Sequence, residues 1–168
     1  ALDSPQRIAR VVREICEDQK EIGVNKTELR FAPHIHGVEP QLMVDAVTNA
    51  LDNDTNVILC GLYGENPKIF EQLVDMAKNN DRVVGIDIAG GPRNTHKYGM
   101  HHYVDAFVEA KKYGIGRTAH VGEGRPASEI VDAILTLDIQ RIGHGCSLLE
   151  SERAVNLVKE RMIVIEAC

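Results

Sequence analysis

Apolar residues recur along the chain at two alternating spacings, and each spacing predicts a different element. The first segment has the helical spacing, with a capping Ser4, a proline in the first turn and one apolar face that ends at Gly23. Short, mostly apolar runs with a strand-like character alternate with further helical segments. The predicted helices are 4–23, 41–51, 66–77, 100–113, 126–137 and 149–160. The predicted strands are 25–31, 56–62, 82–89, 115–120, 139–144 and 162–167.

Strands that are apolar throughout and alternate with helices indicate a parallel sheet buried on both faces, which is an α/β fold. A doubly wound sheet and a (β/α)8 TIM barrel share this pattern. Candidate catalytic residues at the C-terminal ends of several strands favour the barrel. Because such a barrel needs about 250 residues and eight strands, we expect residues 1–168 to form one incomplete barrel domain of about six parallel strands.

Charge and composition exclude several classes of partner. The chain has 19 Lys and Arg against 25 Asp and Glu, a formal net charge of -6, so the positive field that attracts nucleic acid is not expected. It contains no apolar run of the roughly 18 to 20 residues that span a bilayer, which argues against a membrane partner. Four cysteines without a C-x-x-C pair argue against a disulfide framework and favour a cytoplasmic location. They are Cys16, Cys60, Cys146 and Cys168. The oligomeric state is left open.

The densest chemical signal is the run HVGE at 120–123. His120 ends a predicted strand, Gly122 lets the chain turn, and Glu123 follows. An imidazole is a good zinc ligand, and a nearby glutamate can move the proton of an activated water. The pattern is short, so a structural histidine and glutamate at a strand end remain the alternative.

Two further strand ends carry related signals. His144 lies between Gly143 and Gly145, at the end of the strand that follows. Because neighbouring parallel strands end at the same face of a barrel, we expect the His120 and His144 rings to share one site. Asp87 stands near the end of another strand, before a glycine pair; an ordinary glycine turn with a capping aspartate is the alternative.

Four runs resemble, in order, signature segments of the adenosine deaminase family. They are ELRFAP at 28–33, DIAG at 87–90, GRTAHVGE at 116–123 and RIGHG at 141–145. The intervals also resemble the family's, including the 24 positions between the two site histidines (144 − 120). The final IEAC at 165–168 is similar to the family's next strand, so the likeness covers nearly the whole chain.

The resemblance implies a zinc-dependent hydrolysis that removes the amino group of adenosine or a related aminopurine, a small-molecule purine nucleoside. It implies that His120 is a zinc ligand and that Glu123 is the general acid/base that protonates the purine ring. It implies that His144 orients and stabilises the attacking hydroxide. By the same resemblance, Asp87 is a carboxylate beside the zinc site and the Gly90 N–H donates to the purine.

Two departures from the family concern the substrate. Val121 stands where the family usually has alanine, and we expect its bulk beside the metal. The loop 91–92 is Gly-Pro where the family has an acidic pair, which removes charge near the purine. Adenine, a modified adenosine or an adenylate therefore remain alternatives to adenosine.

Other histidines and cysteines are predicted to lie outside the chemistry. His34 and His36 imitate a metal pair, but the run before them resembles a later family strand, so we expect a solvated loop. His101 and His102 are predicted at the surface or rim. Cys60 and Cys146 are predicted to be core or pocket-wall residues, because nothing in the sequence supplies an obvious partner to stabilise a thiolate.

The family's first-strand histidine pair and last-strand aspartate have no counterpart here, so only one zinc ligand is identified. Because a catalytic zinc usually has three protein ligands, the 168 residues alone are predicted to be inactive. Two other functions remain. One is another metal-dependent amidohydrolase, and the other is a catalytically inactive barrel fragment that serves as a binding module.

Overall fold

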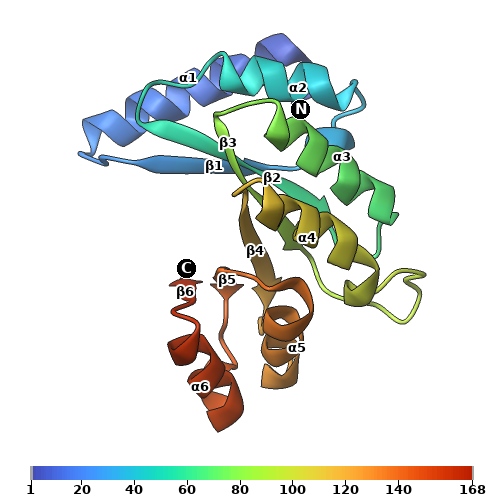
Figure 1. Ribbon diagram of the computed structural model, residues 1–168. Coiled ribbons are helices and arrows are strands. Elements are labelled where there is room, and N and C mark those ends of the chain that lie inside the picture. The colour runs from blue at the N-terminus through green and yellow to red at the C-terminus, as the bar shows by residue number, and fades with distance from the viewer. Residues whose placement is uncertain (1, 168) are drawn as a thin grey trace.

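The centre of the computed structural model, which describes residues 2–167, is a sheet of six parallel strands in the order β1-β2-β3-β4-β5-β6. The strands are β1 (Thr27–Phe31), β2 (Thr55–Leu62), β3 (Val83–Ala89), β4 (Gly116–Val121), β5 (Arg141–His144) and β6 (Val164–Glu166). Each strand pairs with the next along the chain, and the sheet curls into half of a barrel (Figure 1). The prediction of an incomplete TIM barrel with about six parallel strands is confirmed.

Helices alternate with the strands and lie on the outer, convex side of the curled sheet (Figure 1). The helices are α1 (Pro5–Glu21), α2 (Pro40–Thr48), α3 (Pro67–Lys78), α4 (Val104–Lys112), α5 (Ala127–Leu137) and α6 (Glu152–Glu160). Short 3-10 turns, η1 (Pro33–Ile35), η2 (Met100–Tyr103) and η3 (Leu148–Glu150), precede α2, α4 and α6. In the described part of the chain, the inner face of the sheet carries no helix (Figure 1), and it is the side on which a barrel encloses its interior.

Local sequence explains where the elements begin. The Ser4 hydroxyl accepts a hydrogen bond from the Arg7 N–H, and the Asn66 side chain accepts one from the Lys68 N–H. Both residues therefore cap helices that have proline at the first position. The predicted strand 139–144 begins later, at Arg141, because Asp138 adopts a left-handed conformation with φ 50° and turns the chain after α5.

The main hydrophobic core fills the space between the sheet and the outer helices. Its largest fully buried side chains come from strands and helices alike: Tyr103, Phe70, Phe107, Met43, Leu59, Leu73, Ile86, Ile88, Ile130, Ile134, Leu137 and Ile142. Burying an apolar side chain of this size contributes about 1.5–3 kcal/mol. This layer holds the strand ends in place, so the residues that follow them have defined positions.

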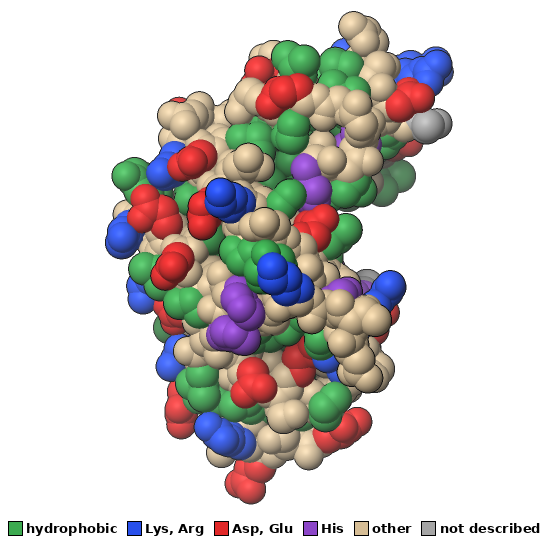
Figure 2. Space-filling view, turned by 90° about the vertical axis from the view of Figure 1, so that its right-hand side faces the viewer, with side chains coloured by type: hydrophobic (Ala, Val, Ile, Leu, Met, Phe, Trp, Pro, Cys, Tyr) green, Lys and Arg blue, Asp and Glu red, His purple; other side chains and the backbone are tan. Residues whose placement is uncertain are grey.

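The helical side of the molecule shows acidic and basic side chains interspersed rather than segregated (Figure 2). No broad basic patch is visible on this face, as expected from the negative net charge. Within residues 2–167, no helix has the length and apolar character needed to cross a bilayer.

Candidate active site

Asp87 and His120 form a buried pair on neighbouring strands. The carboxylate of Asp87, near the end of β3, is completely buried. Its two oxygens lie 3.1 and 3.0 Å from His120 Nδ1, near the end of β4. A carboxylate that engages one ring nitrogen of a histidine fixes the ring orientation and leaves the other nitrogen, Nε2, to act elsewhere.

The His120 and His144 rings lie together, with centroids 5.2 Å apart and planes at 65°. The expected closeness of the two rings is therefore observed. It depends on Gly143, which pairs with His120 in the β4–β5 register. A Cβ atom at Gly143 would lie 2.9 Å from His120 Cγ and Cδ2, so only glycine leaves room for the ring against β5.

His144 ends β5 in a conformation that is uncommon for a residue with a side chain. Its φ is 66°, and Gly145 continues the turn with φ 64°. Such a backbone persists where surrounding structure imposes it, often at a functional site. The turn leaves His144 Nε2 3.4 Å from Glu123 Oε2. Glu123 is exposed and His144 is partly buried, so both side chains can reach a ligand.

The loop that carries Glu123 is held by Glu129 of α5. The Gly122 N–H donates to Glu129 Oε2 at 3.1 Å, and Arg125 Nε donates to Glu129 Oε1 at 2.7 Å. Gly122 itself has φ 77°, the left-handed region that favours glycine. Glu129 was not among the predicted site residues. A glutamate on the buried face of an otherwise apolar helix was the available signal.

Arg30 of β1 is a second residue that the sequence analysis missed, and it reaches the centre of the site. Its guanidinium lies 3.2 Å from His120 Nε2, 3.3 Å from Asp87 Oδ2 and 2.6 Å from Glu166 Oε2. Although burial would lower the pKa of Arg30, the nearby Asp87 and Glu166 carboxylates outweigh it and raise the pKa. Arg30 therefore stays charged within the site.

Gly90 and Val121, the remaining positions predicted near the site, differ in whether they face it. Gly90 follows β3 with φ 73°, and no atom lies within 4 Å of where its Cβ would be, so its backbone is open to a ligand. Val121 is buried in the core. Because adjacent strand residues point to opposite faces, its bulk lies away from the His120 ring. The expectation that Val121 adds bulk beside a metal is therefore wrong.

The four histidines set aside by the sequence analysis lie apart from this pair of rings. His101 and His102 are exposed, as predicted. His34 lies in the short turn η1, and its Nε2 is 2.9 Å from both Glu65 carboxylate oxygens. Its side chain is only 11% exposed. The expectation of a solvated loop is wrong at His34, because the contact with Glu65 and the 3-10 turn bury its side chain, whereas His36 lies in a bend just after the turn.

The cysteines fit supporting roles. Cys60 is buried, and burial together with the negative charge of Asp87 raises the pKa of its thiol. A thiol that resists ionisation is a poor nucleophile, in agreement with the predicted core position. Cys146 is exposed and lines a shallow surface pocket. Cys168 lies outside the described residues.

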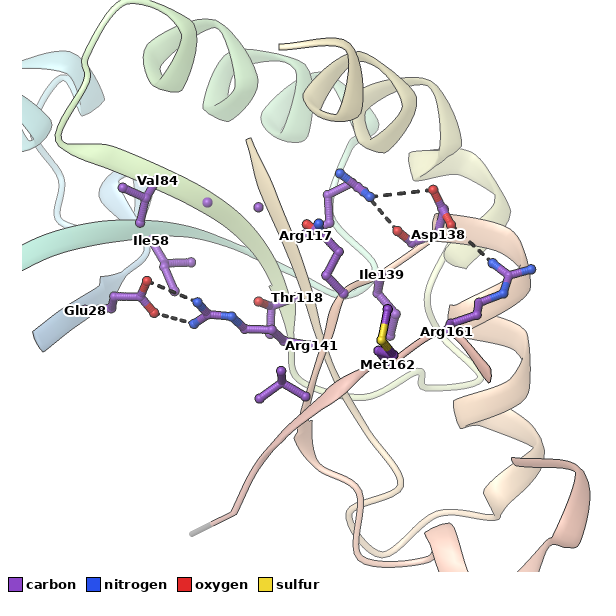
Figure 3. Close-up of a pocket in the computed structure, with 14 residues that line it drawn as sticks. Glu28, Ile58, Val84, Arg117, Thr118, Asp138, Ile139, Arg141, Arg161 and Met162 are labelled. Carbon is purple, nitrogen blue, oxygen red and sulfur yellow. Dashed lines mark hydrogen bonds and ion pairs between the residues drawn. The ribbon is translucent and has the colours of Figure 1, made fainter. Parts of the chain in front are cut away.

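A cavity of about 660 Å³ lies at the other end of the strands (Figure 3). Its charged side chains are already paired. Arg141 forms an ion pair with Glu28, and Asp138 forms ion pairs with Arg117 and Arg161. Catalytic groups of TIM barrels stand at the C-terminal strand ends, whereas the N-terminal ends serve stability. The cluster of Asp87, His120, Glu123 and His144 is therefore the better candidate site.

The site fits one ligand of a zinc ion. His120, with Nδ1 on Asp87, has the carboxylate–histidine arrangement that orients zinc-binding imidazoles. Within residues 2–167, no group of three or more His, Cys, Asp or Glu side chains is placed to hold a metal ion. The described residues thus offer one imidazole that could hold a metal and a carboxylate that orients it, but they do not assemble a complete coordination sphere.

A sequence model of the family described as adenosine deaminase matches residues 1–168, the whole chain. The chain belongs to the adenosine deaminase family. Among curated relatives, an adenosine deaminase from Clostridium kluyveri is 32% identical over 99% of this chain and 51% of its own length. The chain thus spans about half the length of the relatives it matches.

Solved structures show the same fold. An adenine deaminase from Arthrobacter aurescens superposes with a TM-score of 0.84 at 23% identity, covering 99% of this chain and 53% of that protein. An N6-methyl-AMP deaminase from Arabidopsis thaliana gives a TM-score of 0.84 at 24% identity, covering 99% and 53%. Such likenesses establish that the half-barrel is part of the fold that these proteins share.

Proposed function

We propose that, in its full-length protein, this chain carries the proton-transfer half of a zinc-dependent site that hydrolytically deaminates adenosine or a related aminopurine. The observation that supports the proposal most is the convergence of Asp87, His120, His144 and Glu123 at adjacent strand ends. The rings of His120 and His144 lie 5.2 Å apart, and Glu123 lies 3.4 Å from His144. Family membership supplies the reaction class.

Each residue has a role that follows from its position. His120, oriented by Asp87, would hold the zinc ion through Nε2. When bound, zinc would polarise a water molecule so that it attacks the amine-bearing ring carbon near neutral pH. Glu123, exposed beside the ring of His144, would give a proton to a purine ring nitrogen. His144 would hold the attacking water in line, and the open backbone at Gly90 would donate to the purine.

The substrate class follows from the relatives only in outline. The names of similar proteins include adenosine, adenine and N6-methyl-AMP deaminases. All three names refer to purines that carry an amine on the six-membered ring, and deamination of such a purine is what we propose for this chain. The Gly91–Pro92 loop, near the guanidinium of Arg125, is a candidate for the part that distinguishes them.

Release of ammonia, or of methylamine from N6-methyladenylate, by the zinc-loaded full-length protein tests the proposal. Adenosine, adenine, adenylate and N6-methyladenylate form the purine panel, and cytidine and a ring amide form the comparison set. We expect release from one or more aminopurines and none from the comparison set. Release only from the comparison set would favour another amidohydrolase, and silence with bound zinc would favour a binding module.

A further inference from the structure

Arg30 makes an unusual contact with His120, because the atom it approaches is the ring nitrogen that a metal would use. Arg30 Nη1 lies 3.2 Å from His120 Nε2. A guanidinium has only donors, so this nitrogen must be the acceptor. A neutral imidazole that accepts at Nε2 carries its proton on Nδ1, where the Asp87 oxygens at 3.0 and 3.1 Å receive it.

The three contacts of Arg30 make this arrangement specific. Its Nε faces Asp87 Oδ2 at 3.3 Å, and its Nη2 donates to Glu166 Oε2 at 2.6 Å. The ion pair with Asp87 and the hydrogen bond to Glu166 flank the guanidinium, and the remaining corner, Nη1, lies against the imidazole. Arg30 comes from β1 and Glu166 from β6, the two edges of the described sheet, so the arginine bridges the interior.

We propose that Arg30 is a positioning residue that fixes the tautomer of His120 and competes with a divalent cation for its Nε2 lone pair. One lone pair cannot accept from a guanidinium and coordinate a metal about 2.0–2.1 Å away. Cation binding therefore requires Nη1 to leave the ring, while the contacts to Asp87 and Glu166 keep the side chain nearby. The cation part rests on the proposed function, whereas the tautomer part does not.

The 168-residue chain offers a matched pair of variants. Arg141 pairs with the same Glu166, at 3.5 Å, and with Glu28, but it is not among the contacts of His120. Arg30→Gln and Arg141→Gln each remove one positive charge from this network. Only Arg30→Gln removes the donor at Nε2. A general electrostatic effect would therefore appear in both variants, and competition at the lone pair only in one.

Nitrogen NMR of the His120 ring tests both parts. In the unaltered chain we expect the proton on Nδ1 and an accepting Nε2. In a zinc titration monitored by the His120 ring signals, the Arg30→Gln variant should bind zinc about tenfold more tightly than the unaltered chain. This is the size of effect expected when a hydrogen bond from a charged donor no longer competes for the nitrogen. Arg141→Gln should change the affinity far less.

A His120 ring protonated on Nε2 in the unaltered chain would overturn the proposal, and so would equal changes in the two variants. If Arg30→Gln does not fold, Arg30→Lys, which keeps the charge but not the three-way contact, should still weaken competition at Nε2. The tautomer of the unaltered chain decides the first part without any variant. Neither the NMR spectra nor the zinc titration uses a substrate, so their results would remain valid if the protein failed to deaminate purines.

Discussion

At the scale of single residues, the site depends on a missing side chain as much as on those present. Gly143→Ala should push the His120 ring away from β5, because the new Cβ would lie 2.9 Å from ring atoms. We expect the His120–His144 ring contact to be lost in NMR spectra, with a loss of about 1–3 kcal/mol in stability from overpacking. Gly114→Ala, with φ 70° and open space, is the control.

The control separates backbone strain from crowding at the ring. Gly114→Ala should cost about 1 kcal/mol because its backbone is left-handed, and it should leave the His120 signals unchanged. If Gly143→Ala left the His120 signals as they are, the close approach of the ring to β5 would be wrong.

The positions of Asp87, His120 and His144 could be predicted because the ends of parallel strands share one face of the barrel. The part played by Arg30 could not. Its contact with Glu166 spans 136 positions, and a charged residue inside a strand does not reveal which carboxylate it will meet across the interior. The only signal was a pair of charges two residues apart in β1, Glu28 and Arg30, which places both on one face.

At the scale of elements, the corner between α5 and β5 joins three neighbouring side chains through one carboxylate. The Asp138 carboxylate forms ion pairs with Lys111 at 2.8 Å, Arg161 at 3.2 Å and Arg117 at 3.5 Å. The hydrogen bond from Lys111, followed by the charges of the three cations, lowers the pKa of Asp138. Arg117 is nearly buried, and burial lowers the pKa of its guanidinium.

Asp138→Asn keeps a residue that tolerates the left-handed turn but removes the charge. Because Asp138 is 43% exposed, we expect a loss of only about 1 kcal/mol in stability at pH 7, measured by urea unfolding. Its lowered pKa means that the contribution is complete above about pH 4 and is lost as the pH falls through the folded pKa. The difference between the two proteins should therefore shrink in acid.

The surface pair of Lys26 and Asp54, joined at 2.7 Å, is the control. Both side chains are mostly exposed, so Asp54→Asn should have a smaller effect than Asp138→Asn. Equal losses for the two variants would show that the corner at Asp138 has no special role.

Helix starts at this scale were predictable from caps such as Ser4. The delayed start of β5 was not predictable, because the turn at Asp138 carries no glycine.

At the scale of the whole molecule, the strand count predicted the half-barrel, but the contacts across its interior were not predictable. Glu28 and Arg30 of β1 reach Arg141 of β5 and Glu166 of β6. These ion pairs connect distant parts of the curled sheet. Within residues 2–167, β1 and β6 each pair with one strand only, which leaves two sheet edges that favour association.

The isolated 168-residue chain should neither retain one zinc ion per molecule nor deaminate adenosine. The reason is that His120 is the only zinc ligand we assign among residues 2–167, and a catalytic zinc needs about three. Metal analysis after gel filtration measures the first expectation, and ammonia release measures the second. One tightly held zinc per chain would contradict this part of the account.

The central claim is that Glu123, beside His144 and His120, moves the proton in a purine deamination. The most direct measurement is kcat/KM for the best aminopurine in the full-length protein and its Glu123→Gln variant, with the exposed Glu160→Gln as control. The account predicts a loss of about 10²–10⁴-fold for Glu123→Gln and almost none for Glu160→Gln, with zinc content unchanged in both. A Glu123→Gln protein that deaminates as fast as the unaltered one would contradict it.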